Sequence, residues 1–254
     1  MPPVRFGVIG LGDGGKCSLR SLQLLGAVPV ALCDPNIQAA EEALALIPEP
    51  RVNVYNDYRE LMRNPSVDLV IVATPDHMHL GPVAAALLSR KFVFVEKPLA
   101  TTIDDVRSFD VLARRYPGRL IFSEKWLFGY PMEALFAHKE RLGKLLSGHV
   151  SFTQYQSELI MGGGKWRTST HPYNPCAGGG GHFATVLRLL LGPIVAVSAR
   201  GHAHRYEELR GYGGYDTMEG LFEFQDGTVV TWSVCIAVAR RDARLGHRSG
   251  HFSL

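Results

Sequence analysis

The 254-residue sequence contains no apolar run close to the roughly 20 residues that a membrane-spanning helix needs. It has only four cysteines, widely spaced and without a Cys-x-x-Cys pair, which argues against a zinc site and against a disulfide framework. The first residues lack a charged stretch followed by an apolar core, so we expect no secretory signal. These absences favour a cytoplasmic protein with reduced thiols, no membrane partner and no bound metal.

Most of the chain also has no net charge. The formal net charge is +3, and Arg240–Leu254, with four arginines and one acid, accounts for all of it. A nucleic-acid-binding domain needs a basic face, so we expect no nucleic-acid partner. The tail itself has little apolar periodicity, and we predict an irregular basic end from about residue 240.

The composition that is present, 46% hydrophobic and 20% charged residues, is typical of a globular protein. Up to about Ser123, short apolar runs alternate with amphipathic segments, which indicates a parallel sheet covered by helices on both faces. We predict strands over residues 4–9, 28–33, 51–55, 67–73, 92–95 and 120–122. We predict helices over residues 16–25, 37–47, 58–62, 79–89 and 103–115.

The second half of the sequence has a different character. A loop with the glycine clusters 162–164 and 178–181 is followed by a helix predicted to begin at Phe183. The Asp-Gly pair at 226–227 lies between two β-rich runs and suits a tight hairpin turn. We therefore predict an α/β fold with two domains: a doubly wound parallel sheet over residues 1–123, and an α+β domain on a largely antiparallel sheet over residues 124–254.

A glycine-rich segment, Gly-Leu-Gly-Asp-Gly-Gly at 10–15, follows the first predicted strand and opens a helix. In this setting Gly-x-Gly-x-x-Gly binds a dinucleotide. Gly10 allows a tight turn, Gly12 lets a pyrophosphate approach the backbone, and Gly15 lets helix and strand pack closely. The N–H groups and the dipole of the helix then bind the phosphates. The motif predicts an NAD(P)-binding Rossmann domain; the alternative is a glycine-rich turn without a ligand.

Asp34 ends the second predicted strand, about 20 residues after the last glycine of the motif, where an acid hydrogen-bonds the ribose hydroxyls of the adenosine. Its charge would repel a 2′-phosphate, so NAD is favoured over NADP. Asn36 and Gln38 leave dual use open. The alternative is that Asp34 only opens a turn before Pro35.

Two further motifs follow the fourth and fifth predicted strands: Thr-Pro-Asp-His-Met-His at 74–79 and Glu-Lys-Pro at 96–98. In a parallel sheet both lie at the carboxyl edge, where ligands bind. This combination resembles the Gfo/Idh/MocA oxidoreductase family, named for glucose–fructose oxidoreductase, inositol dehydrogenase and a rhizopine-catabolism protein. The resemblance covers the first half of the chain closely and the second half more loosely.

The resemblance implies roles for the residues of these motifs. Lys97 matches the lysine that contacts substrate and nicotinamide and helps to move the hydroxyl proton, and Pro98 matches a proline that often follows a cis bond. A positively charged nicotinamide would favour the neutral form of such a lysine; the alternative is a solvated lysine at a strand end. The cofactor-binding residues so predicted are Gly10, Leu11, Gly12, Asp13, Gly14, Gly15, Asp34, Thr74, Pro75, Asp76, His79, Glu96 and Lys97.

In the second half, the resemblance implies that His182 orients or deprotonates the substrate hydroxyl, so the predicted catalytic residues are Lys97 and His182. Family members carry acids four residues before and three residues after this histidine, where this chain has Gly178 and Thr185. The usual proton relay is therefore incomplete. The alternative is that His182 only caps the predicted helix that follows it.

Residues 161–173, in the second predicted domain, mix cations, aromatic residues and glycines. Such a mixture suits a polyhydroxylated or anionic substrate, because a guanidinium such as that of Arg167 clamps a carboxylate. The alternative for Trp166 is an ordinary packing role. The predicted substrate-binding residues are Lys165, Trp166, Arg167 and His171.

These features together predict an NAD-dependent oxidoreductase that transfers a hydride between nicotinamide and a secondary alcohol or ketone of a sugar, inositol or related polyol. Two alternatives remain open: a non-catalytic dinucleotide-binding sensor or regulator on the same fold, and a glycosidase that uses bound NAD for transient oxidation. The resemblance also implies a homo-oligomer, since family members commonly pair through the open face of the second sheet.

Overall fold

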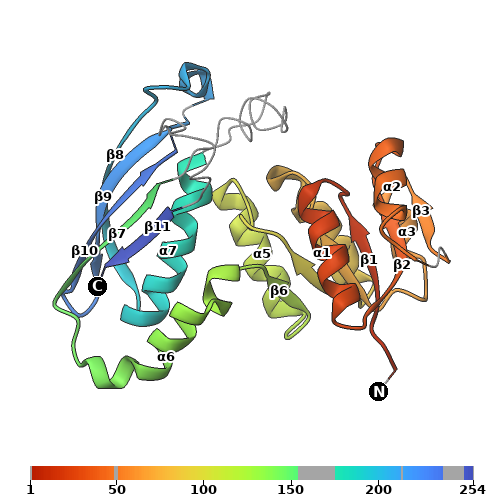
Figure 1. The fold of residues 1–254 in the computed structure, drawn as a ribbon, viewed down its shortest axis with the longest axis horizontal. Helices are drawn as coiled ribbons and strands as arrows, with labels where there is room; N and C mark the ends of the chain where they lie inside the picture. Colours follow the sequence, from red (N-terminus) through yellow and green to blue (C-terminus); the bar gives the residue numbers. More distant parts are fainter. Residues whose placement is uncertain (1, 49–50, 154–174, 213, 237–248, 254) are drawn as a thin grey trace. The chain divides into compact units, whose positions relative to one another are not determined.

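The computed structural model describes residues 2–48, 51–153, 175–212, 214–236 and 249–253. The chain divides into two compact units, Met1–Ser123 and Glu124–Leu254 (Figure 1). None of the helices in the described ranges combines the length and the apolar character that crossing a membrane requires.

The first unit is built on a six-stranded parallel sheet with the strand order β3-β2-β1-β4-β5-β6. The direction of winding reverses between β1 and β4, which makes their carboxyl ends a place for a ligand. The strands are β1 (Arg5–Ile9), β2 (Val28–Cys33), β3 (Asn53–Tyr55), β4 (Leu69–Val72), β5 (Phe92–Val95) and β6 (Leu120–Phe122). The helices are α1 (Asp13–Leu24), α2 (Ile37–Leu44), α3 (Tyr58–Met62), α4 (Leu80–Leu88), α5 (Ile103–Arg115) and the 3-10 turn η1 (Asp76–Met78).

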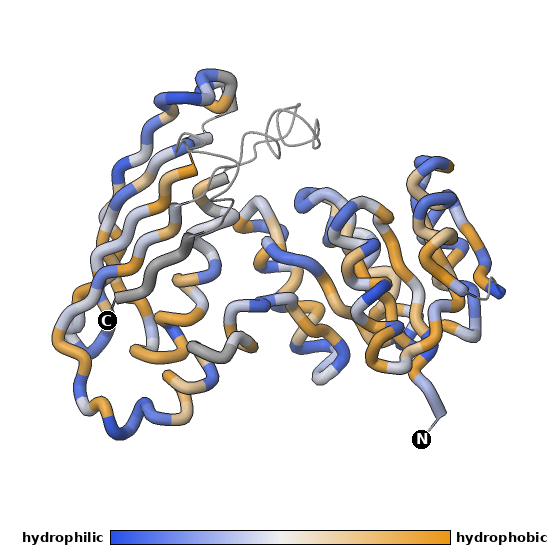
Figure 2. The backbone as a smooth tube through the Cα atoms, viewed as in Figure 1, coloured by the Kyte–Doolittle hydropathy of each residue, from blue (hydrophilic) through white to orange (hydrophobic). Residues whose placement is uncertain are grey.

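Two apolar cores cover the faces of this sheet. Phe6 and Val8 of β1 pack in the core under α1 and α2, whereas Ile9 packs in the core under α3, α4 and α5. Strands that are buried on both faces must be apolar at every position, and the strands of this unit are largely hydrophobic (Figure 2). The predicted doubly wound parallel sheet is confirmed.

The second unit contains a five-stranded sheet with the order β11-β7-β10-β9-β8. The pairing of β7 with β10 is parallel, and the other pairings of this sheet in the described residues are antiparallel. The strands are β7 (Ser147–Thr153), β8 (Ile194–His202), β9 (Thr217–Phe224), β10 (Val229–Cys235) and β11 (Ser249–Ser253). The helices are α6 (Tyr130–Leu142), α7 (Pro175–Leu191) and the 3-10 segments η2 (Lys125–Phe128) and η5 (Glu207–Tyr212).

Helix α7 packs against one face of this sheet and closes the core of the second unit (Figure 1). Phe183 and Leu187 of the helix join Phe222 and Trp232 of the sheet in a single buried cluster. The hairpin predicted around the Asp-Gly pair is confirmed, because β9 and β10 pair antiparallel and Gly227 has a φ of +85°.

Two expectations from the sequence are corrected here. The glycines at 178–181 lie inside α7, not in a loop. A Cβ on Gly179 would lie 2.7 Å from the ring of Phe152, so the helix packs very closely on the sheet at this point. This close approach of helix to sheet offsets the low helix propensity of glycine. In the tail expected to be irregular, residues 249–253 form β11, which pairs with β7. An unpaired strand edge offers backbone hydrogen bonds whatever the apolar periodicity of its partner.

Candidate active site

The glycine-rich loop connects β1 to α1, and at two of its glycines there is no space for a side chain. Gly10 has a φ of +87°, and a Cβ there would lie 2.5 Å from the carbonyl oxygen of Ala73. A Cβ on Gly15 would overlap the carbonyl oxygen of Gly10. A Cβ on Gly12, by contrast, would meet no atom of the described chain within 4 Å. Gly10 and Gly15 are therefore needed by the fold, whereas Gly12 leaves space for the close approach of a pyrophosphate.

Helix α1 begins within the glycine motif, three residues before its predicted start. Gly12 is the N-cap and supplies no side-chain hydrogen bond, so the N–H groups of the first turn keep their capacity to bind an anion. The side chain of Leu11 is fully buried, so only its backbone is available to a ligand. Asp13 lies in the first turn, and Gly14 has open space around its Cα. The loop fits a dinucleotide.

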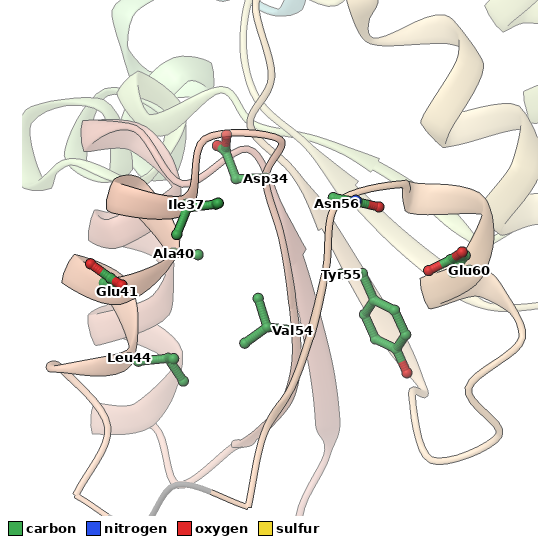
Figure 3. Close-up of a pocket in the computed structure, with 9 residues that line it drawn as sticks. All are labelled: Asp34, Ile37, Ala40, Glu41, Leu44, Val54, Tyr55, Asn56 and Glu60. Carbon is green, nitrogen blue, oxygen red and sulfur yellow. The ribbon is translucent and has the colours of Figure 1, made fainter.

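Asp34 lies directly after β2 and ties this strand end to the glycine loop. Its Oδ2 accepts the backbone N–H of Leu11 at 2.7 Å, and its Oδ1 accepts the N–H of Asn36 at 2.8 Å. Asp34 also lines a hollow of about 420 Å³ between α2 and β3 (Figure 3). Glu41 and Glu60 line the same hollow, and three carboxylates disfavour an added phosphate. The surroundings therefore fit NAD better than NADP.

The turn after β4 is supported from within by a histidine. His79 is 1% exposed, and its Nε2 donates to the carbonyl oxygen of Thr74 at 3.0 Å. Because a carbonyl oxygen only accepts, Nδ1 of His79 is left as an acceptor, and it has no hydrogen-bond partner in the described part of the chain. Asp76 is buried, and Pro75 precedes η1. His79 thus holds the turn in place from its buried side.

The turn after β5 carries the predicted lysine. Glu96 and Lys97 are half-buried, and the Glu96 carboxylate accepts the backbone N–H of Lys97 at 3.3 Å. The Lys97–Pro98 peptide bond is cis, as the resemblance implies. Since β5 pairs with β4 and β4 with β1, the glycine loop and both turns lie at the same edge of the sheet.

In the second unit, His182 lies inside α7, seven residues after its start, so it does not cap the helix. Its Nδ1 lies 2.5 Å from Oε1 of Glu124, and both side chains are 5% exposed. The indole of Trp126 stacks on the imidazole with 4.8 Å between ring centroids and 1° between ring planes. The same Glu124 oxygen accepts the backbone N–H of Trp126 at 3.3 Å.

Glu124 was not among the residues predicted from the sequence. The resemblance implies acids within a few residues of His182, whereas Glu124 lies 58 residues earlier in the chain. It lies two residues after the end of β6 and is the first residue of the second unit. An acid after a strand is a common turn residue, so its only local signal was its place at the carboxyl end of β6.

The remaining predicted residues are distributed as follows. Lys97 belongs to the first unit and His182 to the second. Lys165, Trp166, Arg167 and His171 lie outside the described residues. Within the described ranges, no group of three or more His, Cys, Asp or Glu side chains is placed to hold a metal ion.

Comparisons with curated proteins find relatives among glycosidases. The α-N-acetylgalactosaminidase of Shewanella oneidensis is 29% identical over 185 residues, which cover 67% of this chain and 40% of that protein. A glycosyl hydrolase family 109 protein of Streptomyces coelicolor is 31% identical over 170 residues, covering 63% of this chain and 36% of that protein. The chain thus spans about two fifths of the length of these curated relatives.

Solved structures of inositol dehydrogenases share the fold. Myo-inositol 2-dehydrogenase from Lactobacillus plantarum is 19% identical with a TM-score of 0.78, covering 93% of this chain and 71% of that chain. Scyllo-inositol dehydrogenase from Lactobacillus casei, solved with NAD(H) and scyllo-inositol, is 20% identical with a TM-score of 0.77, covering 91% and 69%.

Two family models match the chain almost end to end. Residues 4–123 match the NAD-binding Rossmann fold of the Gfo/Idh/MocA oxidoreductase family, and residues 134–247 match a Gfo/Idh/MocA C-terminal domain. These matches agree with the glycine loop, Asp34 and the sheet order described above. The chain therefore belongs to the Gfo/Idh/MocA oxidoreductase family and carries its NAD-binding Rossmann domain.

Proposed function

We propose that the chain is an NAD-dependent oxidoreductase acting on a secondary alcohol or ketone of a sugar, inositol or related polyol. The observation that carries this proposal is the buried contact between His182 and Glu124 in a chain that also has an NAD-binding domain. Removing a hydroxyl proton requires a positioned base, and a histidine backed by a carboxylate is suited to that work.

The proposed reaction breaks two bonds of the alcohol, C–H and O–H, to form the ketone. Bound NAD⁺ supplies the acceptor for the hydride. The residues of the chain handle the proton: Lys97 contacts the hydroxyl and helps to move its proton, and His182 assists by accepting the proton at its ring. In the reverse direction the same groups return the proton to the ketone oxygen. Lys165, Trp166, Arg167 and His171 remain proposed substrate-binding residues.

The first experiment is a titration of the purified chain with NADH and with NADPH, followed by nicotinamide fluorescence. We expect saturable binding of NADH and weaker binding of NADPH. A screen of inositols, sugars and sugar acids with NAD⁺ then follows NADH formation, with Lys97→Ala as the control for turnover. A folded chain that binds neither cofactor would overturn the proposal. Cofactor binding without turnover of any alcohol would favour the alternative of a non-catalytic dinucleotide-binding sensor or regulator.

A second candidate function is supported by the curated relatives, which are glycosidases. An NAD-dependent glycosidase oxidises the sugar only transiently, so it begins with the same removal of a hydride and a proton and ends with no net NADH. The test is an aryl α-N-acetylgalactosaminide supplied with catalytic NAD⁺. Release of the aryl alcohol without accumulation of NADH selects the glycosidase, and steady NADH formation from a free polyol selects the dehydrogenase.

A further inference from the structure

A carboxylate and an imidazole are buried against each other in the second unit. The side chains of Glu124 and His182 are each 5% exposed, and a contact of 2.5 Å joins Oε1 of the first to Nδ1 of the second. Burying an ionisable group is costly unless the group is paired, so this contact is required for either side chain to remain inside. The usual position of an acid near this histidine, by contrast, is occupied by Gly178.

The residues on α7 that stand where acids are implied do not serve the histidine. Gly178 has no side chain, and the hydroxyl of Thr185 donates to the carbonyl oxygen of Gly181 at 3.1 Å, inside its own helix. The carboxylate reaches His182 instead from the segment that begins the second unit. We propose that Glu124 is the positioning residue of this site and replaces the acids missing from α7; the proposal rests on the proposed oxidoreductase function.

Two contacts from the same segment fix the imidazole. Glu124 binds the Nδ1 edge, and Trp126 covers one ring face with nearly parallel planes. Glu124 is itself held in place, because its Oε1 also accepts the N–H of Trp126. An ionised carboxylate only accepts hydrogen bonds, so Nδ1 carries the proton and Nε2 carries the lone pair. The ring is thereby fixed in the tautomer whose Nε2 can accept a proton.

The chemical consequence follows during oxidation of the alcohol. When the hydroxyl proton reaches Nε2 of His182, the ring becomes an imidazolium, and the negative charge of Glu124 stabilises it. Glu124 takes no proton, just as the aspartate of a Ser-His-Asp triad remains ionised while it holds its histidine in one tautomer. On return to the resting state the proton leaves from Nε2, and Nδ1–H remains bonded to Glu124 throughout.

The tautomer is the direct test and needs no substrate. The full chain is labelled with ¹⁵N at its ten histidines, and the signals of His182 are assigned by their loss in His182→Gln. At alkaline pH we expect the neutral ring to carry its proton on Nδ1. A neutral ring with the proton on Nε2 would mean that Glu124 donates to Nδ1, and this result overturns the proposal without any variant of Glu124.

Kinetics give the second test, with Glu124→Gln and with Glu133→Gln as the matched control. Glutamine keeps an oxygen that can accept the N–H of Trp126 but removes the negative charge. The variant therefore distinguishes the effect of the charge from an effect on the fold. We expect kcat to fall by about 10²-fold in Glu124→Gln, with the substrate KM and the NADH Kd within twofold of wild type. The exposed Glu133 of α6 should tolerate the same change.

The two possible failures can be told apart. If wild type turns over neither a polyol nor a glycoside, the proposed function fails, and the ¹⁵N tautomer still decides the role of Glu124. If wild type is active and Glu124→Gln keeps its kcat, the role of Glu124 fails while the oxidoreductase function stands. If Glu124→Gln lowers kcat but also weakens NADH binding more than tenfold, the residue is structural and the proposal is overturned.

Discussion

The carboxylate of Asp34 accepts the backbone N–H of Leu11 at 2.7 Å, so the end of β2 is bonded to the glycine loop. NAD needs the same carboxylate for the hydroxyls of its adenosine ribose. The hydrogen bonds of Asp34 to Leu11 and Asn36 hold the glycine loop and the turn after β2 in one arrangement. Preorganisation of this kind lowers the entropic cost of binding.

The first prediction concerns cofactor choice. Asp34→Ser should weaken NADH binding by at least tenfold and should narrow the preference over NADPH, because the hydroxyl keeps a polar contact but removes the charge that repels a 2′-phosphate. Fluorescence titrations with both cofactors measure the ratio of the two Kd values. Glu133→Gln, at an exposed position of α6 in the second unit, is the control. An unchanged ratio in Asp34→Ser would contradict the assigned role.

The second prediction separates binding from folding within the glycine motif. Gly12→Ala places its methyl group in open space, so the melting temperature should change little while NADH affinity drops more than tenfold. Gly15→Ala forces a Cβ onto the carbonyl oxygen of Gly10 and should cost about 2 kcal/mol or more of stability. Thermal unfolding and NADH titration of both variants check this. Equal loss of stability in the two would be inconsistent with the geometry.

The third prediction compares two glycines of α7. Gly179→Ala should destabilise the second unit by about 1–3 kcal/mol, because its Cβ would lie 2.7 Å from the ring of Phe152. The Cβ of Gly181→Ala would meet no described atom within 4 Å apart from its chain neighbours and the backbone of its own helix, so this change should stabilise the helix by about 0.5–1 kcal/mol. Urea denaturation followed by tryptophan fluorescence suits this comparison, since all three tryptophans lie in residues 124–254. The predicted effects have opposite signs.

The fourth prediction is a pH dependence that arises at Asp216, which is fully buried. Burial alone would raise the pKa of this carboxyl, but hydrogen bonds from the backbone N–H groups of Tyr206, His204 and Arg205 and from the Thr217 hydroxyl outweigh burial and lower the pKa below 3.8. Because the pKa of Asp216 is lower in the folded chain than in the unfolded chain, its ionised form stabilises the fold at pH values above the unfolded-state pKa. This stabilisation is lost as the pH falls through the folded-state pKa.

Asp216→Asn therefore lowers the free energy of unfolding at pH 7, by about 1–3 kcal/mol for a buried group that loses its partners. The difference from wild type should be constant down to about pH 5 and should shrink as the pH falls through 3.8, the ordinary pKa of the group, towards the lower folded value. Urea denaturation at several pH values measures it. A difference that grows as the pH falls would contradict the lowered pKa.

The features of the first unit could be predicted because their signals are local. A buried parallel strand is apolar at every position, so it can be recognised from its own residues. Likewise, the backbone at Gly10 has a φ of +87°, a conformation that favours glycine, so the residue type itself indicates the tight turn. The order of these signals along the chain then determines the sheet, since parallel strands joined by helices have few possible arrangements. Asp34 was found for the same reason, by its spacing from the glycines.

The second unit was harder to predict because its determinants are contacts between distant residues. Helix propensity argues against a helix through Gly178–Gly181, and only the ring of Phe152, from another element, explains why the helix continues. The place of Glu124 at the carboxyl end of β6 does not indicate that its partner is His182, 58 residues later in the chain. Tertiary packing determines both features, and neither helix propensity nor motif spacing carries information about tertiary packing.

The parallel pairing of β7 with β10 has a consequence for synthesis of the chain. Ser147 lies beside Val229 in this register, so β7 leaves the ribosome long before its central partner exists. The sheet of the first unit is complete by Phe122, whereas β7 stays without β10 until more than eighty further residues have been added. Closing such a distant contact is slow. During translation the second unit therefore passes through an interval in which its strands need protection from other nascent chains.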